Sequence, residues 1–248
     1  MLLDTFALTI TGRRSDNEDA VCARPDLGLF VVADGMGGYE GGEIASKVAV
    51  ATIEDLVSRT AGDQDVTWPY RIDPRRGIVE NEVAVATRLA GDRIAARRHG
   101  HLAQMGSTVA VLRLEGGHAV IGHVGDSRVY RLRDGALEQL TVDHSLWAQL
   151  LAAGAELPER EDFAYRHVVT RALGTTSGEA DVRVEAARAG DVFLLCSDGL
   201  SEVLAPARIA ALLALPAAAA CHALVDEAFA AGSRDNISAV VVRVVSEN

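Results

Sequence analysis

Four aspartates stand where strands are expected to begin or end, and each lies beside glycine, serine or asparagine. Asp34 follows the apolar run 29–33 and precedes Gly35; the other three are Asp126, Asp198 and Asp235. A short apolar run that stops at glycines is typical of a buried strand. The carboxylates are therefore expected at the rim of a core, where an unpaired charge is costly. Few lysines or arginines lie near them in the sequence, so we expect divalent cations to neutralise them.

The kind of cation follows from the donor atoms. The pattern offers oxygen ligands, with no cysteine or histidine at ligand spacing. Such a set favours a hard ion, Mn²⁺ or Mg²⁺. Taken singly, each aspartate is more typical of a turn or a helix cap. Four of them in one repeated pattern favour a shared metal site.

A cationic turn precedes these acids in the sequence. Arg13 and Arg14 lie in the polar stretch 13–19, next to Glu18 and Asp19. An arginine binds phosphate through two parallel hydrogen bonds, although a lone arginine more often forms a surface ion pair. Beside a metal site, this turn favours the binding of a phosphate dianion.

Composition narrows the class of protein. The chain has 248 residues, enough for one large domain or two small ones, and a net charge of −11. It lacks the basic patch typical of nucleic-acid binding or of anionic membranes. No apolar run approaches the roughly 20 residues of a membrane span, and the N-terminus lacks the basic region of a signal peptide. Three scattered cysteines predict free thiols in a reducing compartment. We expect a soluble, monomeric cytoplasmic protein, complete in itself.

Periodicity and turn residues predict a layered α+β fold. Helices are expected at 43–59, 78–98, 145–155, 206–214 and 216–231, and strands at 5–11, 20–23, 29–33, 108–114, 118–124, 127–133, 136–141, 181–188, 191–197 and 237–245. Short glycine-containing spacers predict hairpins. The strands between 106 and 141 would form one meander, and 181–188 would pair with 191–197. We expect two antiparallel sheets packed face to face with helices outside.

Eight short motifs now identify a family resemblance. The chain resembles the metal-dependent serine/threonine protein phosphatases of the PP2C (PPM) type, in their bacterial form. The matching motifs occur in the family's order, and they are RSDNEDA (14–20), VVADGMGG (31–38), GSTV (106–109), HVGDSRVY (123–130), LTVDHS (140–145), TRALG (170–174), LLCSDGLS (194–201) and SRDNIS (233–238). The resemblance implies a four-layer αββα sandwich, a single domain over 1–248 and a mobile flap at about 145–180.

The resemblance also implies how the metals are held. Asp34 would bridge two Mn²⁺ or Mg²⁺ ions, and the carbonyl of Gly35 would add a ligand to one of them. Asp198 and Asp235 would hold the other ion. Asp126, together with Asp198, would support a third and weaker ion.

Four further residues receive roles from the same resemblance. Arg14 would bind the phosphate of the substrate. Glu18 and Asp19 would act through metal-bound waters, and Asn236 would brace the site.

The chain departs from the family at the expected general acid. Many eukaryotic relatives carry histidine where this chain has Met36, and many bacterial relatives carry histidine where it has Tyr39. The acid is therefore unassigned, with metal-bound water as one candidate. His123 and His144 lie within the matching motifs, and we interpret both as structural.

The activity implied is hydrolysis of phosphoserine and phosphothreonine in proteins by direct attack of metal-activated water, opposing a bacterial serine/threonine kinase. The sequence disfavours two other functions. A nucleotide-binding module is disfavoured because the glycines at 35–38 are followed by Glu40, so the G-x-G-x-x-G spacing fails, and because Asp34 would repel a pyrophosphate. A non-catalytic phosphoprotein-binding relative is disfavoured because such chains usually lose a metal aspartate, and here all are present.

Overall fold

The structure is a computed structural model that describes residues 2–38, 40–61 and 67–245. Two antiparallel sheets form the centre of the fold. The first sheet has the strand order β1 (Leu2–Ile10), β11 (Ile237–Val245), β10 (Val192–Cys196), β7 (Arg128–Arg133) and β8 (Ala136–Gln139). The second has the order β2 (Asp19–Arg24), β3 (Leu29–Met36), β5 (Val109–Glu115), β6 (His118–Val124) and β9 (Asp181–Ala186), with β4 (Gly106–Ser107) paired to β3.

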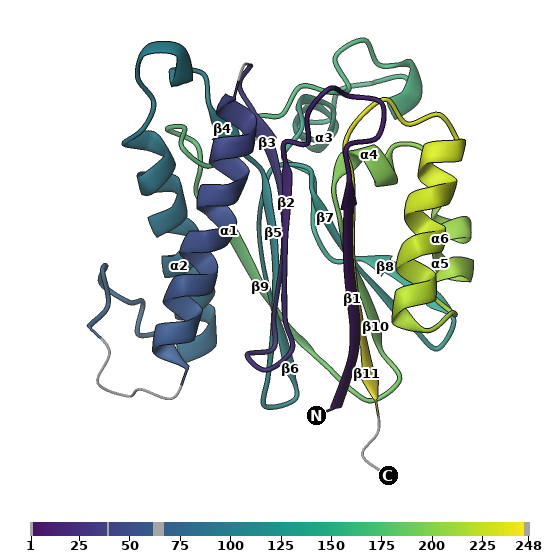
Figure 1. The fold of residues 1–248 in the computed structure, drawn as a ribbon, viewed down its shortest axis with the longest axis horizontal. Helices are drawn as coiled ribbons and strands as arrows, with labels where there is room; N and C mark the ends of the chain where they lie inside the picture. Colours follow the sequence, from purple (N-terminus) through teal and green to yellow (C-terminus); the bar gives the residue numbers. More distant parts are fainter. Residues whose placement is uncertain (1, 39, 62–66, 246–248) are drawn as a thin grey trace.

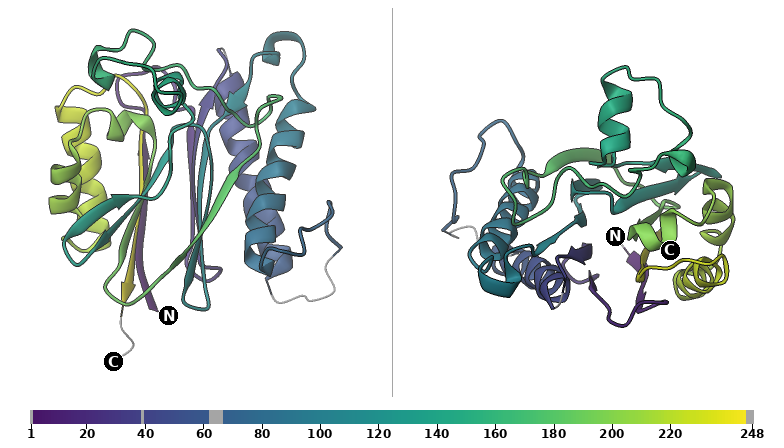
Figure 2. Two further views of the ribbon diagram at one scale, coloured as in Figure 1. Left: turned by 180° about the vertical axis from the view of Figure 1, so that it is seen from behind. Right: turned by 90° about the horizontal axis from the view of Figure 1, so that it is seen from above.

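Helices cover the outer face of each sheet (Figure 1). Helices α1 (Gly41–Thr60) and α2 (Ile78–Ala95) pack on the second sheet, and α4 (Asp198–Ser201), α5 (Pro206–Leu212) and α6 (Ala217–Ala230) pack on the first. The remaining helical elements are α3 (Leu146–Ala152) and two short 3₁₀ turns, η1 (Gly100–Leu102) and η2 (Arg160–Asp162). In the view from above, α3 and the chain that follows it stand out from the sandwich (Figure 2). The predicted αββα architecture is confirmed.

Burial on both faces explains the continuous apolar strands. Successive side chains of a strand point to opposite faces. In β3, Phe30 and Val32 join the core between the two sheets, whereas Leu29, Val31 and Ala33 join the core beneath α1 and α2. A strand in this position needs an apolar residue at every step, so Leu29–Ala33 shows no alternation.

Two of the predicted hairpins are wrong. Strands β6 and β7 lie in different sheets, as do β9 and β10, because the chain crosses from one sheet to the other at each connection. Strand β9 pairs with β6, and β10 pairs with β11 and β7. A glycine-containing spacer shows only that the chain turns, and it does not specify which sheet receives the next strand.

Two other predictions concern single features of the chain. Cys22, Cys196 and Cys221 are all free and buried, as expected. Among the residues described, no helix combines the length and the apolar character that crossing a bilayer requires.

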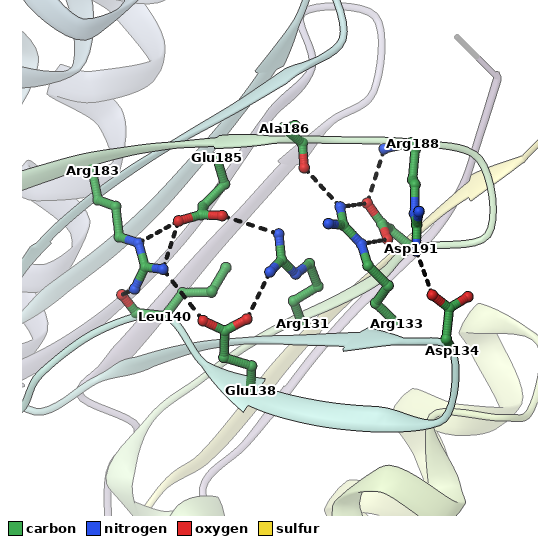
Figure 3. A network of polar contacts seen from close by, with 10 residues as sticks. All are labelled: Arg131, Arg133, Asp134, Glu138, Leu140, Arg183, Glu185, Ala186, Arg188 and Asp191. Carbon is green, nitrogen blue, oxygen red and sulfur yellow. Dashed lines mark hydrogen bonds and ion pairs between the residues drawn. The ribbon is translucent and has the colours of Figure 1, made fainter.

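A polar network joins the two sheets along one side (Figure 3). Arg131 of β7 donates to Glu138 of β8 at 2.6 Å and to Glu185 of β9 at 3.2 Å. Arg133 forms two 2.6 Å hydrogen bonds with the buried carboxylate of Asp191. These contacts connect β9, in the second sheet, to the first sheet.

The Arg133–Asp191 pair is expected to stabilise the fold. Asp191 is 1% exposed, and its removal would leave the Arg133 guanidinium without its main partner. We expect Asp191→Ala to lower the free energy of unfolding by about 3 kcal/mol in urea titrations. Asp134→Asn is the control, because Asp134 meets Arg188 on the surface and asparagine tolerates its positive φ of 51°, and it should cost less than about 1 kcal/mol. Equal losses in the two variants would contradict this role for the buried pair.

Candidate metal centre

The end of β3 and the start of β11 lie at the same end of the sandwich (Figure 1). Strands β3 and β6 are both antiparallel to β5, so the end of β3, with Asp34, lies near the β6–β7 turn, with Asp126. Strand β10 is antiparallel to β11, so the end of β10 lies near the start of β11. Asp198 follows β10 after one residue, as the first residue of α4, and Asp235 precedes β11 by one residue. The predicted site is therefore brought together by strand pairing.

Electrostatics show that these carboxylates share one site. Burial raises the pKa of Asp34 well above its ordinary value, and the pKa is raised further by the charges of Asp19, Asp198, Asp126 and Asp235. Burial also raises the pKa of Asp198 strongly, and further contributions come from Asp126, Glu202, Asp235 and Asp19. Like charges raise one another's pKa only at close range. Without a cation, this group of acids resists full ionisation.

Two members of the group are themselves deeply buried. Burial raises the pKa of Asp126 to about 6. Burial also raises the pKa of Asp19 to about 6, against two hydrogen bonds that favour its ionised form. Those bonds come from the hydroxyl of Ser197 at 2.8 Å and the hydroxyl of Ser238 at 2.6 Å, both to Oδ2. Asp19 pairs with Asp34 across β2 and β3, so its position beside the centre is fixed by strand pairing in the second sheet and by two hydroxyls from the first.

The donor atoms fit divalent cations. Oδ1 of Asp19 and Oδ1 of Asp198 are buried and have no hydrogen-bond partner in the described part of the chain. A buried carboxylate oxygen without a partner is costly, and a cation would remove that cost. At Gly35 a side chain is excluded, because its Cβ would lie 2.0 Å from the carbonyl oxygen of Gly42. The set of carboxylates and backbone carbonyls matches Mn²⁺ or Mg²⁺.

Glu18 lies against the first turn of α1. A Cβ added to Gly42 would come within 2.2 Å of Glu18 Oε1. Burial raises the pKa of Glu18, while Arg14 and a hydrogen bond from the backbone of Gly42 act to lower it. The carboxylate thus meets free N–H groups at a helix start, where negative charge is stabilised.

Arg14 and Asp235 form an exposed ion pair at the mouth of the site. Arg14 Nη2 lies 2.7 Å from Asp235 Oδ2, and the two side chains are 52% and 38% exposed. This hydrogen bond is the main cause that raises the pKa of Arg14. An ion pair this exposed is weakly held, so Arg14 is free to exchange Asp235 for an anion.

Asn236 fixes the loop that carries Arg14. Its Nδ2 donates to the carbonyl oxygens of Thr11 and Asp16, both at 2.9 Å, and its Oδ1 accepts from the backbone N–H of Glu18 at 2.8 Å. These three bonds join the β1–β2 loop to the turn before β11. The bracing position expected for Asn236 is therefore present.

The two motif histidines hold neighbouring backbone. Their rings stack with centroids 4.5 Å apart. His123 Nε2 lies 2.8 Å from the carbonyl oxygen of Val142, and His144 Nδ1 accepts from the N–H of Gly125 at 3.1 Å. Both contacts support the turn that bears Asp126. At the positions where relatives carry a histidine, Met36 has no proton to donate and Tyr39 lies outside the described residues.

Two groups of possible metal ligands contain histidine. In the group formed by His123, His144 and Asp181, Arg171 Nη1 lies 2.8 Å from Asp181 Oδ1 and 3.3 Å from His144 Nε2. This guanidinium already supplies the positive charge, so a metal ion is disfavoured there.

The other group adds two residues that the sequence analysis missed. It consists of Asp198, Glu202 and His167, whose ligand atoms all lie within 4.8 Å of one another. The sequence contains a signal for Glu202, because this residue follows Asp198 by four positions and therefore lies on the same face of a helical turn. His167 had none, since only the folding of residues 145–180 places it there.

Comparison with known proteins identifies the family. The sequence model of the family described as protein phosphatase 2C matches residues 12–239 of this chain. The chain is 31% identical to the protein phosphatase PhpP of Streptococcus pneumoniae, over 99% of each chain. It is 34% identical to the serine/threonine protein phosphatase PstP of Mycobacterium tuberculosis, over 94% of this chain and 43% of PstP. The chain thus spans less than half the length of PstP.

Solved structures agree with this result. A crystal structure of the Mycobacterium tuberculosis phosphatase PstP/Ppp has a TM-score of 0.87 at 32% identity, covering 99% of this chain and 100% of that one. The catalytic domain of PstP in complex with two manganese ions has a TM-score of 0.83 at 34% identity, covering 98% and 99%. The chain belongs to the protein phosphatase 2C family, and the resemblance seen in its motifs is confirmed.

The cost of ionising Asp126 predicts a pH-dependent stability. Its pKa of about 6 in the folded chain exceeds the value of about 3.9 in an unfolded chain. Metal-free protein therefore loses stability as pH rises from about 4 to about 6. In chelator at pH 7.5, Asp126→Asn should raise the free energy of unfolding by roughly 3 kcal/mol, and this gain should shrink as pH falls towards 4.

Urea titrations at several pH values measure this effect. The control Asp226→Asn removes an exposed carboxylate from α6 and should change stability little at any pH. A gain at Asp126 that does not depend on pH would refute the electrostatic explanation.

Proposed function

We propose that this protein hydrolyses phosphoserine and phosphothreonine in other proteins, with Mn²⁺ or Mg²⁺ in the carboxylate centre. One observation carries the proposal: burial, together with the charges of acids from distant parts of the chain, raises the pKa of Asp34 and of Asp198 at a single place, beside an exposed arginine. The relatives PstP and PhpP are themselves named as protein phosphatases.

Each site residue has a proposed role at the metals. Asp34 would be a ligand of two ions, and the carbonyl oxygen of Gly35 would add a ligand to one of them. Asp198 and Asp235 would hold the other ion, and Asp126 together with Asp198 would support a third. When bound, the cations supply a water of lowered pKa and screen the negative charge of the phosphate.

The chain's own residues bind and orient the phosphate. Arg14 leaves Asp235 and donates two hydrogen bonds to phosphate oxygens, because its guanidinium matches their spacing. Asn236 keeps the Arg14 loop in register through its three backbone contacts. Glu18 and Asp19 would accept hydrogen bonds from water bound to the metal ions.

A thiol nucleophile plays no part in this proposal. All three cysteines are buried, and burial raises the pKa of each thiol to about 12. At neutral pH they are protonated, and a protonated thiol is a poor nucleophile. Hydrolysis therefore adds the oxygen of water to phosphorus and returns the seryl or threonyl hydroxyl.

We place the activity in a single domain, residues 1–248, with residues 145–180 as a flap beside the site. One backbone bridge, Ser145 to Val169, closes the segment on itself, and a second, Leu173 to Ser107 of β4, attaches it to the sandwich. Within the segment, Arg160 Nη2 reaches Glu202 Oε1 at 3.5 Å, next to the metal centre. The segment is thus anchored to the sandwich and can contact a bound phosphoprotein.

The proposed setting is regulatory. Phosphoproteins are the partners that this chemistry requires, and we propose that a serine/threonine kinase and its substrates are among them. We further propose a monomer acting in the cytoplasm, which agrees with three free thiols. A non-catalytic phosphoprotein-binding role is disfavoured because every carboxylate of the proposed centre is retained.

Removal of metal tests the mechanism directly. With phosphopeptides as substrate, chelator should reduce turnover to background, and added Mn²⁺ should restore it. Asp198→Ala should lower kcat about a thousandfold or more, since it removes several kcal/mol of transition-state stabilisation. The exposed control Asp226→Ala should keep full turnover. Full metal occupancy without turnover of any phosphopeptide would instead favour the non-catalytic role.

Substitution of Arg14 tests phosphate binding. Losing a charge-assisted hydrogen bond costs about 1.5–3 kcal/mol, so Arg14→Ala should raise KM for a phosphopeptide about tenfold or more. Arg14→Lys should recover part of this loss, because lysine keeps the charge without the paired geometry. Mn²⁺ affinity, measured by calorimetry, should not fall in either variant. The control is Arg59→Ala, whose side chain binds Asp55 along α1; an equal rise in its KM would refute the assignment.

A further inference from the structure

A histidine from the 145–180 segment lies beside two carboxylates at the metal centre. His167 Nδ1 is 3.2 Å from Glu202 Oε1, and the ligand atoms of His167, Glu202 and Asp198 lie within 4.8 Å of one another. The two acids come from α4 and its C-terminal cap, whereas His167 follows η2. Oδ1 of Asp198 is buried without a hydrogen-bond partner among the described residues. A donor set of this kind, with an unsatisfied oxygen, can hold a cation.

We propose that Asp198, Glu202 and His167 form a cation site with one nitrogen ligand. The proposal rests on the proposed function only through the role of Asp198 as a metal ligand. It differs from the third-ion pair that the family implies, Asp126 with Asp198, because it takes a second carboxylate from the end of α4 and an imidazole from the flap. An imidazole ligand favours Mn²⁺ and later transition metals over Mg²⁺.

The surrounding charges allow a cation to enter. Glu202 Oε1 is also approached by Arg160 Nη2 at 3.5 Å, while Arg160 Nη1 lies 3.2 Å from Asp143 Oδ2. A cation bound to Glu202 would displace the Arg160 guanidinium from that carboxylate. Arg160 would retain its ion pair with Asp143. The side chain of His167 is 55% exposed, so its ring can turn towards an incoming ion.

A cation at this site would join the flap to α4. His167 is the only one of the three ligands outside the 198–202 segment. Binding the ion therefore fixes the position of the chain around His167 relative to Asp198. Metal occupancy would then control how the segment covers the bound phosphoprotein.

Pulsed electron paramagnetic resonance on the full chain tests the nitrogen ligand. The core set contains only oxygen donors, so ¹⁴N coupling to Mn²⁺ would report the imidazole. Wild-type protein loaded with three equivalents of Mn²⁺ should show this coupling, and His167→Ala should lose it. The control His101→Ala removes an exposed histidine in η1 and should keep it. Absence of coupling in the wild type, or its persistence in His167→Ala, would overturn the proposal.

Calorimetry and proteolysis give independent measurements. The weakest class of Mn²⁺ site should lose affinity about tenfold or more in His167→Ala and Glu202→Gln, with the two tighter classes unchanged. Mn²⁺ should slow tryptic cleavage after Arg160 and Arg166 in the wild type and not in His167→Ala. Unchanged weak-site affinity in both variants would also overturn the proposal.

Failure of the site and failure of the proposed function are separable. Phosphopeptide turnover without ¹⁴N coupling would remove this site and leave the phosphatase assignment intact. Coupling without turnover would do the reverse.

Discussion

Repulsion among buried carboxylates is the constraint on which the rest of this structure depends. Burial is the main cause that raises the pKa of Asp34 and of Asp198, and the charge of Asp126 raises both further. Such a group opposes folding, because ionised acids lose their water and gain like-charged neighbours. The protein tolerates this cost at one end of the sandwich, where cations can remove it. The same destabilised group is therefore the natural place for metal ions.

Burial of apolar side chains in three cores offsets the free-energy cost of these acids. One lies between the sheets, and one lies beneath each helical layer. Strands such as β3 are buried on both faces and carry Asp34 where the core stops. Hydroxyls from Ser197 and Ser238, on the opposite sheet, hold Asp19 in place. The acids are thus positioned by rigid strands, which keeps their oxygens in a fixed arrangement.

Two weakly held groups of charges complete the site. Arg14 forms one exposed pair with Asp235, while Asn236 anchors the loop that carries Arg14. His167 and Arg160 share the carboxylate of Glu202. Weak surface pairs can be exchanged for a phosphate or a cation at little cost. The rigidly held acids define where the metals bind. The cationic side chains exchange their partners when a phosphate or a metal ion binds.

The local signals of the sequence determined the types of the main elements, the layered class of fold and the residues of the carboxylate centre. Apolar runs that end near Asp34 and Asp198 predict buried strands, because the type of an element is encoded by the pattern of a few neighbouring residues and by the glycines that end it. Only the tertiary structure decided that β6 and β7, and likewise β9 and β10, lie in different sheets. It alone brought His167 to Glu202 and Asp198. Strand partners and flap contacts depend on packing between distant segments, and no local pattern encodes that packing.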